Sequence, residues 1–229
     1  MKFKLIFSLL VLPFLCHAQG KITRPIGQNN PQEIMPKTNC TTVVTMGSSN
    51  GHDWVDLGLP SGTLWAKCNY GASSVHDSGY YLSWGGLDIP MDNMYTPENS
   101  MLFEKKIGDI SGNSTYDVVR KNWGGRWRMP TKTDFLELAK YCKCEVRIEN
   151  GVKGAKILGP NGNSIFIPNN SVKRNGSISE ADDVTLWLAT SSETEWADVL
   201  TCGGDTWGFK TSGNLHKFVG CPIRPVLSK

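Results

Sequence analysis

The chain has 229 residues, of which 24 are Lys or Arg and 21 are Asp or Glu, giving a formal net charge of +3. No basic block or stripe appears along it, so we expect neither nucleic acid nor an anionic membrane surface as its main partner. The length suffices for one well-buried domain and a short tail.

The first segment, residues 1–18, has the pattern of a secretory signal. Two lysines precede an apolar run at 5–15, which is too short to span a membrane comfortably, and we expect cleavage after Ala18. The alternative is lipidation of Cys16, although the bulky Leu15 before it is unlike the small residue that lipidation requires. No later apolar stretch has the length of a transmembrane helix. We therefore expect an exported chain, either secreted or held at the outer cell surface or in the periplasm.

Residues 19–51 form a leader or linker rich in Pro, Asn and Thr, in which only Thr41–Met46 is typical of a strand, at the edge of a sheet. Aromatic residues begin after it, so we place one domain at 52–229. Alternating runs at Val55–Leu59 and Leu64–Cys68 surround a Pro-Ser-Gly turn and predict a hairpin. Residues Gly79–Gly85 form an aromatic strand between glycines in this interpretation.

Residues 88–122 are polar and irregular, with a helical turn expected at 116–119. The central stretch, WGGRWRMPTKTDFLELAKYC at Trp123–Cys142, predicts an amphipathic helix that begins at the N-cap Thr131 and carries an acidic capping box through Asp134. Its apolar residues recur with helical spacing, so we expect it to lie on a sheet.

The remaining elements follow from alternation and turn chemistry. A strand at 144–148 precedes a hairpin whose arms, 156–158 and 164–167, bracket Gly-Pro-Asn-Gly-Asn. Residues 168–183 are expected to be a loop. Three further strands are predicted at 184–189, 207–210 and 223–227.

Five segments together resemble one family: VDLGLPSGTLWAKCNYGAS, GYYLSWGG, ISGNSTYDVVRKNWGGRWRMPTKTDFLEL, NGVKGAKILGPNGNSIFIP and GCPIRPV. The chain resembles the Fibrobacter succinogenes major paralogous domain of exported proteins in Bacteroidota and Fibrobacterota. The resemblance implies an α+β, C-type-lectin-like fold, with a twisted antiparallel sheet, one or two helices and long loops. It also implies a surface or secreted module for adhesion or binding.

The last third departs from the family pattern at PNNSVKRNGSISEADD and LWLATSSE, on the loop side of such a fold. We therefore expect a ligand to touch the surface made by 169–183 and 193–207. Two tryptophans there are candidate stacking platforms, and packing over the last strands is their alternative role. The candidate ligand-binding residues are Asn169, Asn170, Asp182, Asp183, Glu193, Trp196 and Trp207.

We expect no metal or other cofactor. The Glu-Pro-Asn, Gln-Pro-Asp and Trp-Asn-Asp strings of sugar-binding C-type lectins do not occur, although oxygens of Asn169, Asn170, Asp182, Asp183, Glu193 and Glu195 offer a weak calcium site as the alternative. Recognisable hydrolase motifs are also missing around His52, His76 and His216. The sequence favours a non-catalytic module that binds a glycan or a protein. A structural subunit of a surface assembly, such as a pilus tip, is the first alternative, and an uncharacterised enzyme is the second.

Six cysteines remain after the signal, and an even number in an exported chain predicts disulfides. The adjacent pair Cys142 and Cys144 follows a helix end, which disfavours a redox role. Resemblance to the family supports joining Cys68 to Cys142. Cys202 and Cys221 flank one predicted strand and form the second expected bond, which leaves Cys40 for Cys144.

Overall fold

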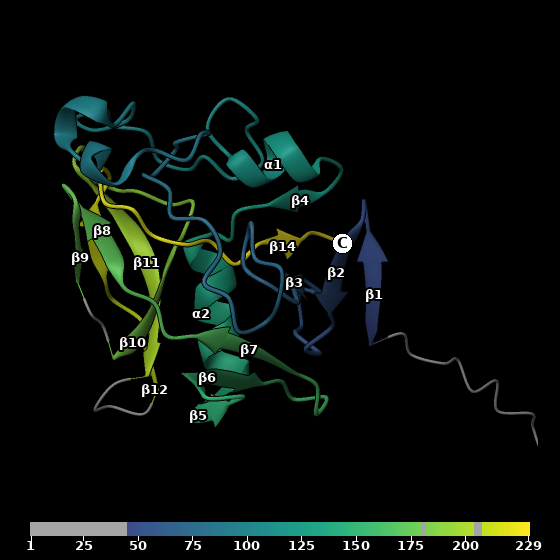
Figure 1. Cartoon of the computed structure of the whole chain (residues 1–229). Helices are drawn as coiled ribbons and strands as arrows, with labels where there is room; N and C mark the ends of the chain where they lie inside the picture. The colour runs from purple at the N-terminus through teal and green to yellow at the C-terminus, as the bar shows by residue number, and fades with distance from the viewer. Residues whose placement is uncertain (1–44, 180–181, 204–207) are drawn as a thin grey trace, which may run out of the picture. The chain divides into compact units, whose positions relative to one another are not determined.

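The structure, a computed structural model, describes residues 45–179, 182–203 and 208–229, and its compact unit runs from Thr42 to Lys229. Antiparallel strands dominate this unit, accompanied by a few short helices, which confirms the expected α+β class. In Figure 1, helix α2 (Lys132–Tyr141) lies in the middle, with strands on either side of it and below it. No helix in the described ranges is both long enough and apolar enough to cross a membrane.

The largest sheet has the strand order β1-β2-β3-β14-β4. Its strands are β1 (Met46–Ser49), β2 (His52–Val55), β3 (Leu64–Ala66), β14 (Val226–Leu227) and β4 (Trp127–Arg128). β3 confirms the second arm of the first predicted hairpin, and it pairs with β2 with Trp54 opposite Ala66. The first arm was predicted wrongly, because β2 ends at Val55, where the predicted strand at 55–59 begins. β1 pairs with β2, so regular structure starts six residues before the expected domain boundary at His52.

A second sheet confirms the hairpin predicted after the central helix. It has the order β5-β6-β7, with β5 (Lys143–Glu149), β6 (Val152–Leu158) and β7 (Ser164–Pro168). The next segment was expected to be a loop, and this prediction is wrong in part. β8 (Val172–Arg174) and β9 (Ser177–Ser179) form a hairpin there. Asn175 and Gly176 both have positive φ at its turn, as a two-residue hairpin loop of this kind requires.

A third sheet contains the longest strand of the described chain, β11 (Trp196–Gly203), which the sequence did not predict. It pairs with β10 (Asp183–Trp187), β12 (Gly208–Lys210) and β13 (Asn214–His216). The segment predicted as a strand at Gly79–Gly85 makes only an isolated bridge, between Leu82 and Cys221. Residues 88–122 are largely irregular, as expected, with 3-10 turns η1 (Asp92–Met94) and η2 (Pro97–Asn99).

Both α-helices begin at side-chain caps. Thr131 and Asp134 form the predicted capping box at the start of α2, and Arg128 pairs with Asp134 at 2.7 Å. α1 (Val118–Trp123) begins at the buried Asp117, whose carboxylate accepts hydrogen bonds from four backbone N–H groups. One of these belongs to Met129, so the cap also fixes the chain that leads into α2.

The buried apolar side chains of the described residues form two hydrophobic cores. The first core gathers around Trp84, Trp127 and Trp187, and the second surrounds α2 through Phe135 and Leu138. Strands β10 and β11 separate them, because their successive residues alternate between the two cores. Each of these two strands therefore contributes buried side chains to both cores, with Asp and Thr among its half-buried positions.

A buried cation joins the first hairpin to β7. Arg224 is 0% exposed, and its Nε donates to Asn69 Oδ1 at 2.7 Å. Its terminal nitrogens donate to the carbonyls of Ala66, Lys67 and Phe166 at 2.6–3.0 Å. Burial lowers the pKa of Arg224 to about 10, so the guanidinium stays charged at neutral pH while backbone oxygens solvate it.

Candidate functional site

Four of the predicted ligand residues lie where β7 ends and β10 begins, and each has a partner in the chain. Asn170 is only 2% exposed, and its amide both accepts from and donates to the backbone of Thr185. Asn169 donates to the Asp182 carbonyl at 2.7 Å. The carboxylates of Asp182 and Asp183 pair with Lys153 and Lys210, respectively. The structure therefore brings these four residues together, but gives Asn170 a structural role.

The other predicted segment lies at the start of β11. Glu193 is exposed and Trp196 is half-buried, and the carbonyls of both residues lie within hydrogen-bond distance of the Ser191 hydroxyl, which can donate its one proton to either. The buried Ser191 side chain therefore lies between the two ends of this short loop and ties them together. Trp207 lies outside the described residues.

Trp196 belongs to an aromatic cluster that the sequence did not predict. It lies directly opposite His216 in the β11–β13 pairing, and the two rings stack with centroids 3.6 Å apart. His216 stacks in turn on Phe218 at 5.1 Å, and Phe103 meets Phe218 edge to face at 5.4 Å. All four side chains are half-buried. We call Phe103, Trp196, His216 and Phe218 the aromatic surface.

A buried lysine next to the aromatic surface holds two loops together through hydrogen bonds. Lys217 is 0% exposed, and its Nζ donates to the carbonyls of Lys105, Glu193 and Thr194 at 2.8–2.9 Å. The same Nζ lies 4.7 Å from the ring centroid of Trp84, a cation–π contact. Burial lowers the pKa of Lys217 from its ordinary value. One ammonium group thereby joins the loop after Phe103 to the loop before Trp196.

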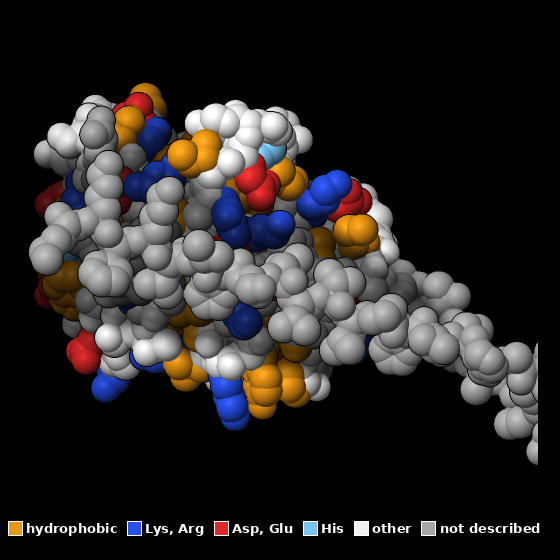
Figure 2. Space-filling view, turned by 90° about the horizontal axis from the view of Figure 1, so that it is seen from below, with side chains coloured by type: hydrophobic (Ala, Val, Ile, Leu, Met, Phe, Trp, Pro, Cys, Tyr) orange, Lys and Arg blue, Asp and Glu red, His pale blue; other side chains and the backbone are white. Residues whose placement is uncertain are grey.

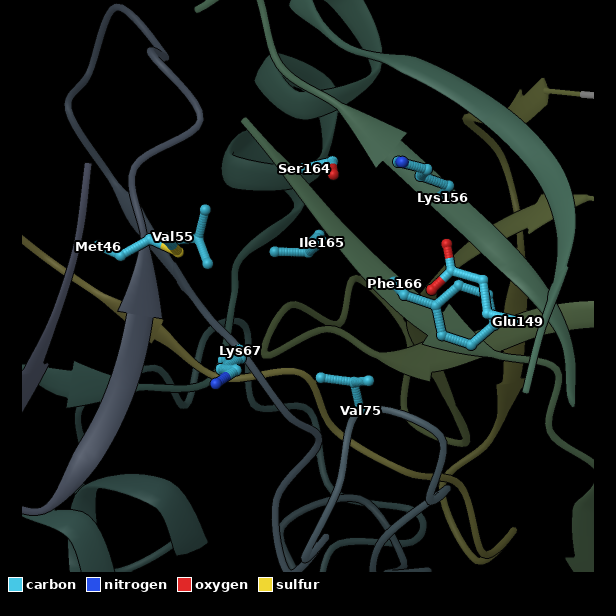
Figure 3. Close-up of a pocket in the computed structure, with 9 residues that line it drawn as sticks. All are labelled: Met46, Val55, Lys67, Val75, Glu149, Lys156, Ser164, Ile165 and Phe166. Carbon is cyan, nitrogen blue, oxygen red and sulfur yellow. The ribbon is translucent and has the colours of Figure 1, made fainter. Parts of the chain in front are cut away.

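A groove lies elsewhere on the molecule, between the β1–β2 hairpin and β7, with a volume of about 230 Å³. Figure 3 shows its lining side chains: Met46, Val55, Lys67, Val75, Glu149, Lys156, Ser164, Ile165 and Phe166. Its apolar floor comes from buried Val55, Ile165 and Phe166, while Lys67 pairs with Asp53 at 3.6 Å. The volume is below the roughly 300–1,000 Å³ of typical small-molecule sites. A single side chain or a small chemical group fits such a groove better than a larger ligand does.

Charges are mixed on the face that Figure 2 presents, where Lys and Arg side chains are interspersed with Asp and Glu. The described residues of this face thus present no field of one sign to a partner. In the described ranges, no group of three or more His, Cys, Asp or Glu is placed to hold a metal ion.

The two predicted disulfides among described cysteines are not formed, and Cys68, Cys142, Cys144, Cys202 and Cys221 are free thiols. Cys202 belongs to the second core and Cys221 to the first, so the β10–β11 layer separates them. The Cys221 thiol donates instead to the Thr185 carbonyl at 3.1 Å. Cys142 packs in the second core, whereas Cys68 lies half-buried beside Arg224. Cys40, the expected partner of Cys144, lies outside the described residues.

Comparison with known proteins gives no match: no family model, curated protein or solved structure matches this chain.

Proposed function

We propose that this chain is an exported, non-catalytic binding module with a C-type-lectin-like fold, and that its aromatic surface contacts the ligand. The motif resemblance supports the lectin-like fold, as does the combination of antiparallel sheets with two short helices in the described chain. The signal-like start supports export.

The observation that carries this proposal is the Trp196–His216–Phe218 stack on loops fixed by Lys217. Aromatic side chains on a preorganised base lose little conformational entropy on binding, which is why such groups dominate many binding sites. Glu104 directly follows Phe103, and Glu193 lies three residues before Trp196; both residues are exposed, and their carboxylates can accept hydrogen bonds from hydroxyl groups. A ligand with apolar faces and many hydroxyls, such as a glycan, fits this combination best.

Binding of the purified protein to a glycan array is the test, repeated with the variant Trp196→Ala. We expect the wild type to retain one class of glycan and the variant to lose at least about tenfold in affinity, as removal of a hot-spot aromatic does. Trp123→Ala is the matched control, because Trp123 is also half-buried and stacks on a histidine, His52, with centroids 3.7 Å apart.

The control should lose as much stability as the Trp196 variant and keep its affinity. Equal loss of binding in both variants, or unfolding of Trp196→Ala alone, would remove the aromatic surface as the contact site. A wild type that retains no glycan would eliminate the glycan as ligand.

Export is tested separately by N-terminal mass analysis of the protein recovered from outside the cytoplasm. We expect the first residue to be Gln19, because the predicted cleavage follows Ala18. A diacylglycerol-modified Cys16 would instead show a lipid-anchored protein.

A further inference from the structure

Two cysteines from different sheets meet at the edge of the second core. Cys144 lies on β5 and is half-buried, while Cys202 lies on β11 and is 0% exposed. Their strands are in contact here, since a Cβ built on Gly203 would lie 3.8 Å from Val146 Cγ2. The two thiols share a hydrogen bond in which Cys202 donates to the Cys144 sulfur. Cys202 belongs to the second core and Cys144 packs against that core, so both thiols lie in the same layer of side chains.

We propose that Cys144 and Cys202 form a disulfide bond in the mature protein, and that this bond joins the β5-β6-β7 sheet to the β10–β11 sheet. The proposal replaces the pairings of Cys144 with Cys40 and of Cys202 with Cys221. It rests on the proposed export for its setting, because disulfides persist in oxidising compartments and are rare in the cytosol.

The chemistry is thiol–disulfide exchange with a disulfide donor, either a small-molecule disulfide or a dithiol oxidase of the compartment. The Cys144 thiolate attacks one sulfur of the donor, breaks the donor's S–S bond and forms a mixed disulfide. The Cys202 sulfur then attacks Cys144 Sγ and displaces the donor's second thiolate. The two protons released by the cysteines balance the two thiolates of the reduced donor.

The environments of the two thiols suit this order of events. The hydrogen bond from Cys202, aided by the backbone N–H of Gly203, lowers the pKa of Cys144 against the effect of burial. The same hydrogen bond and burial raise the pKa of Cys202. Cys144 is therefore both the more accessible sulfur and the one that more readily forms the attacking thiolate.

The test uses the full chain, incubated with oxidised and reduced glutathione, followed by alkylation and peptide mapping without reductant. We expect one peptide pair joining Cys144 to Cys202. We also expect a reductant to lower the melting temperature by about 10 °C, as loss of a native disulfide does in a domain of this size. Recovery of Cys202 as an alkylated free thiol, or joined to Cys142 or Cys221, would overturn the proposal.

Two variants separate the bond from general effects of thiol loss. Cys144→Ser should abolish the effect of reductant on the melting temperature. Cys142→Ser should leave that effect intact. Cys142 packs in the same core, but its pKa is raised by burial and by Glu137 and not by another thiol. If both variants keep the effect, the bond is elsewhere. The oxidation is carried out on purified protein and does not depend on export. An uncleaved signal would therefore contradict the export proposal without affecting the test of the Cys144–Cys202 bond.

Discussion

Replacing Arg224 with methionine is expected to lower the free energy of unfolding by about 3–5 kcal/mol. The guanidinium is fully buried and donates to four oxygens: Asn69 Oδ1 and the carbonyls of Ala66 and Phe166 in buried bonds, and the carbonyl of Lys67 in a part-buried one. Methionine fills a similar volume and donates no hydrogen bond. The cost is therefore the desolvation of four acceptors left without donors.

Chemical denaturation of the wild type and the variant measures this loss as a shift in the midpoint at constant slope. Arg174→Met is the matched control, because Arg174 lies on β8 with an exposed side chain, and its midpoint should barely change. Arg224→Lys should recover only part of the stability, since one ammonium lacks the planar fork that reaches acceptors on several sides. A small effect of Arg224→Met would mean that water enters to replace the guanidinium.

Replacing Lys217 with methionine is expected to lower the free energy of unfolding by about 2–4 kcal/mol and also to weaken ligand binding. The ammonium group satisfies the carbonyls of Lys105, Glu193 and Thr194, two of which lie in the loop that leads into Trp196. The variant removes no side chain of the aromatic surface. Any loss of affinity therefore measures how much that surface depends on a fixed loop.

The control for this variant is Lys105→Met, which removes an exposed ammonium and leaves the backbone carbonyl that Lys217 contacts. Stability is followed by thermal unfolding and binding by titration with the glycan identified on the array. If the Lys217→Met variant is destabilised but keeps its affinity, the aromatic surface does not need the hydrogen bonds from Lys217 to that loop in order to bind the ligand.

Helix starts and turns that depend only on residues next to one another in the chain were predictable from the sequence. The capping box of α2 lies within four residues of chain, and the turn between β6 and β7 carries its own glycines and asparagines. β11 was missed because its apolar residues face two different cores, so its sequence, WADVLTCG, shows no regular alternation of apolar and polar residues. The β8–β9 hairpin did carry a signal, the Asn175-Gly176 turn, which its very short strands obscured.

Only a residue that stands out by its own type and immediate neighbours, such as Trp196, could be predicted from the sequence as part of the candidate site. Trp196 stood out because of its size and polar surroundings, whereas His216 joins it through strand register, which local sequence does not reveal. Asn170 was predicted as a ligand because its segment departs from the family pattern, yet it bonds to Thr185 on the neighbouring strand. Likewise, the contact between Cys144 and Cys202 arises from the packing of two sheets, which the spacing of cysteines along the chain does not encode.

The position of β14 determines when the largest sheet can form. This strand comes from the last residues of the chain, yet it lies between β3 and β4, with Val226 opposite both Trp65 and Arg128. β3 and β4 therefore have no shared neighbour until Val226 and Leu227 have been synthesised. Pairings over such sequence separations form slowly, because loop closure precedes any gain from contact. During synthesis, strands β1 to β4 consequently remain without the strand that completes their sheet, and the residues that β14 covers stay exposed until it is added.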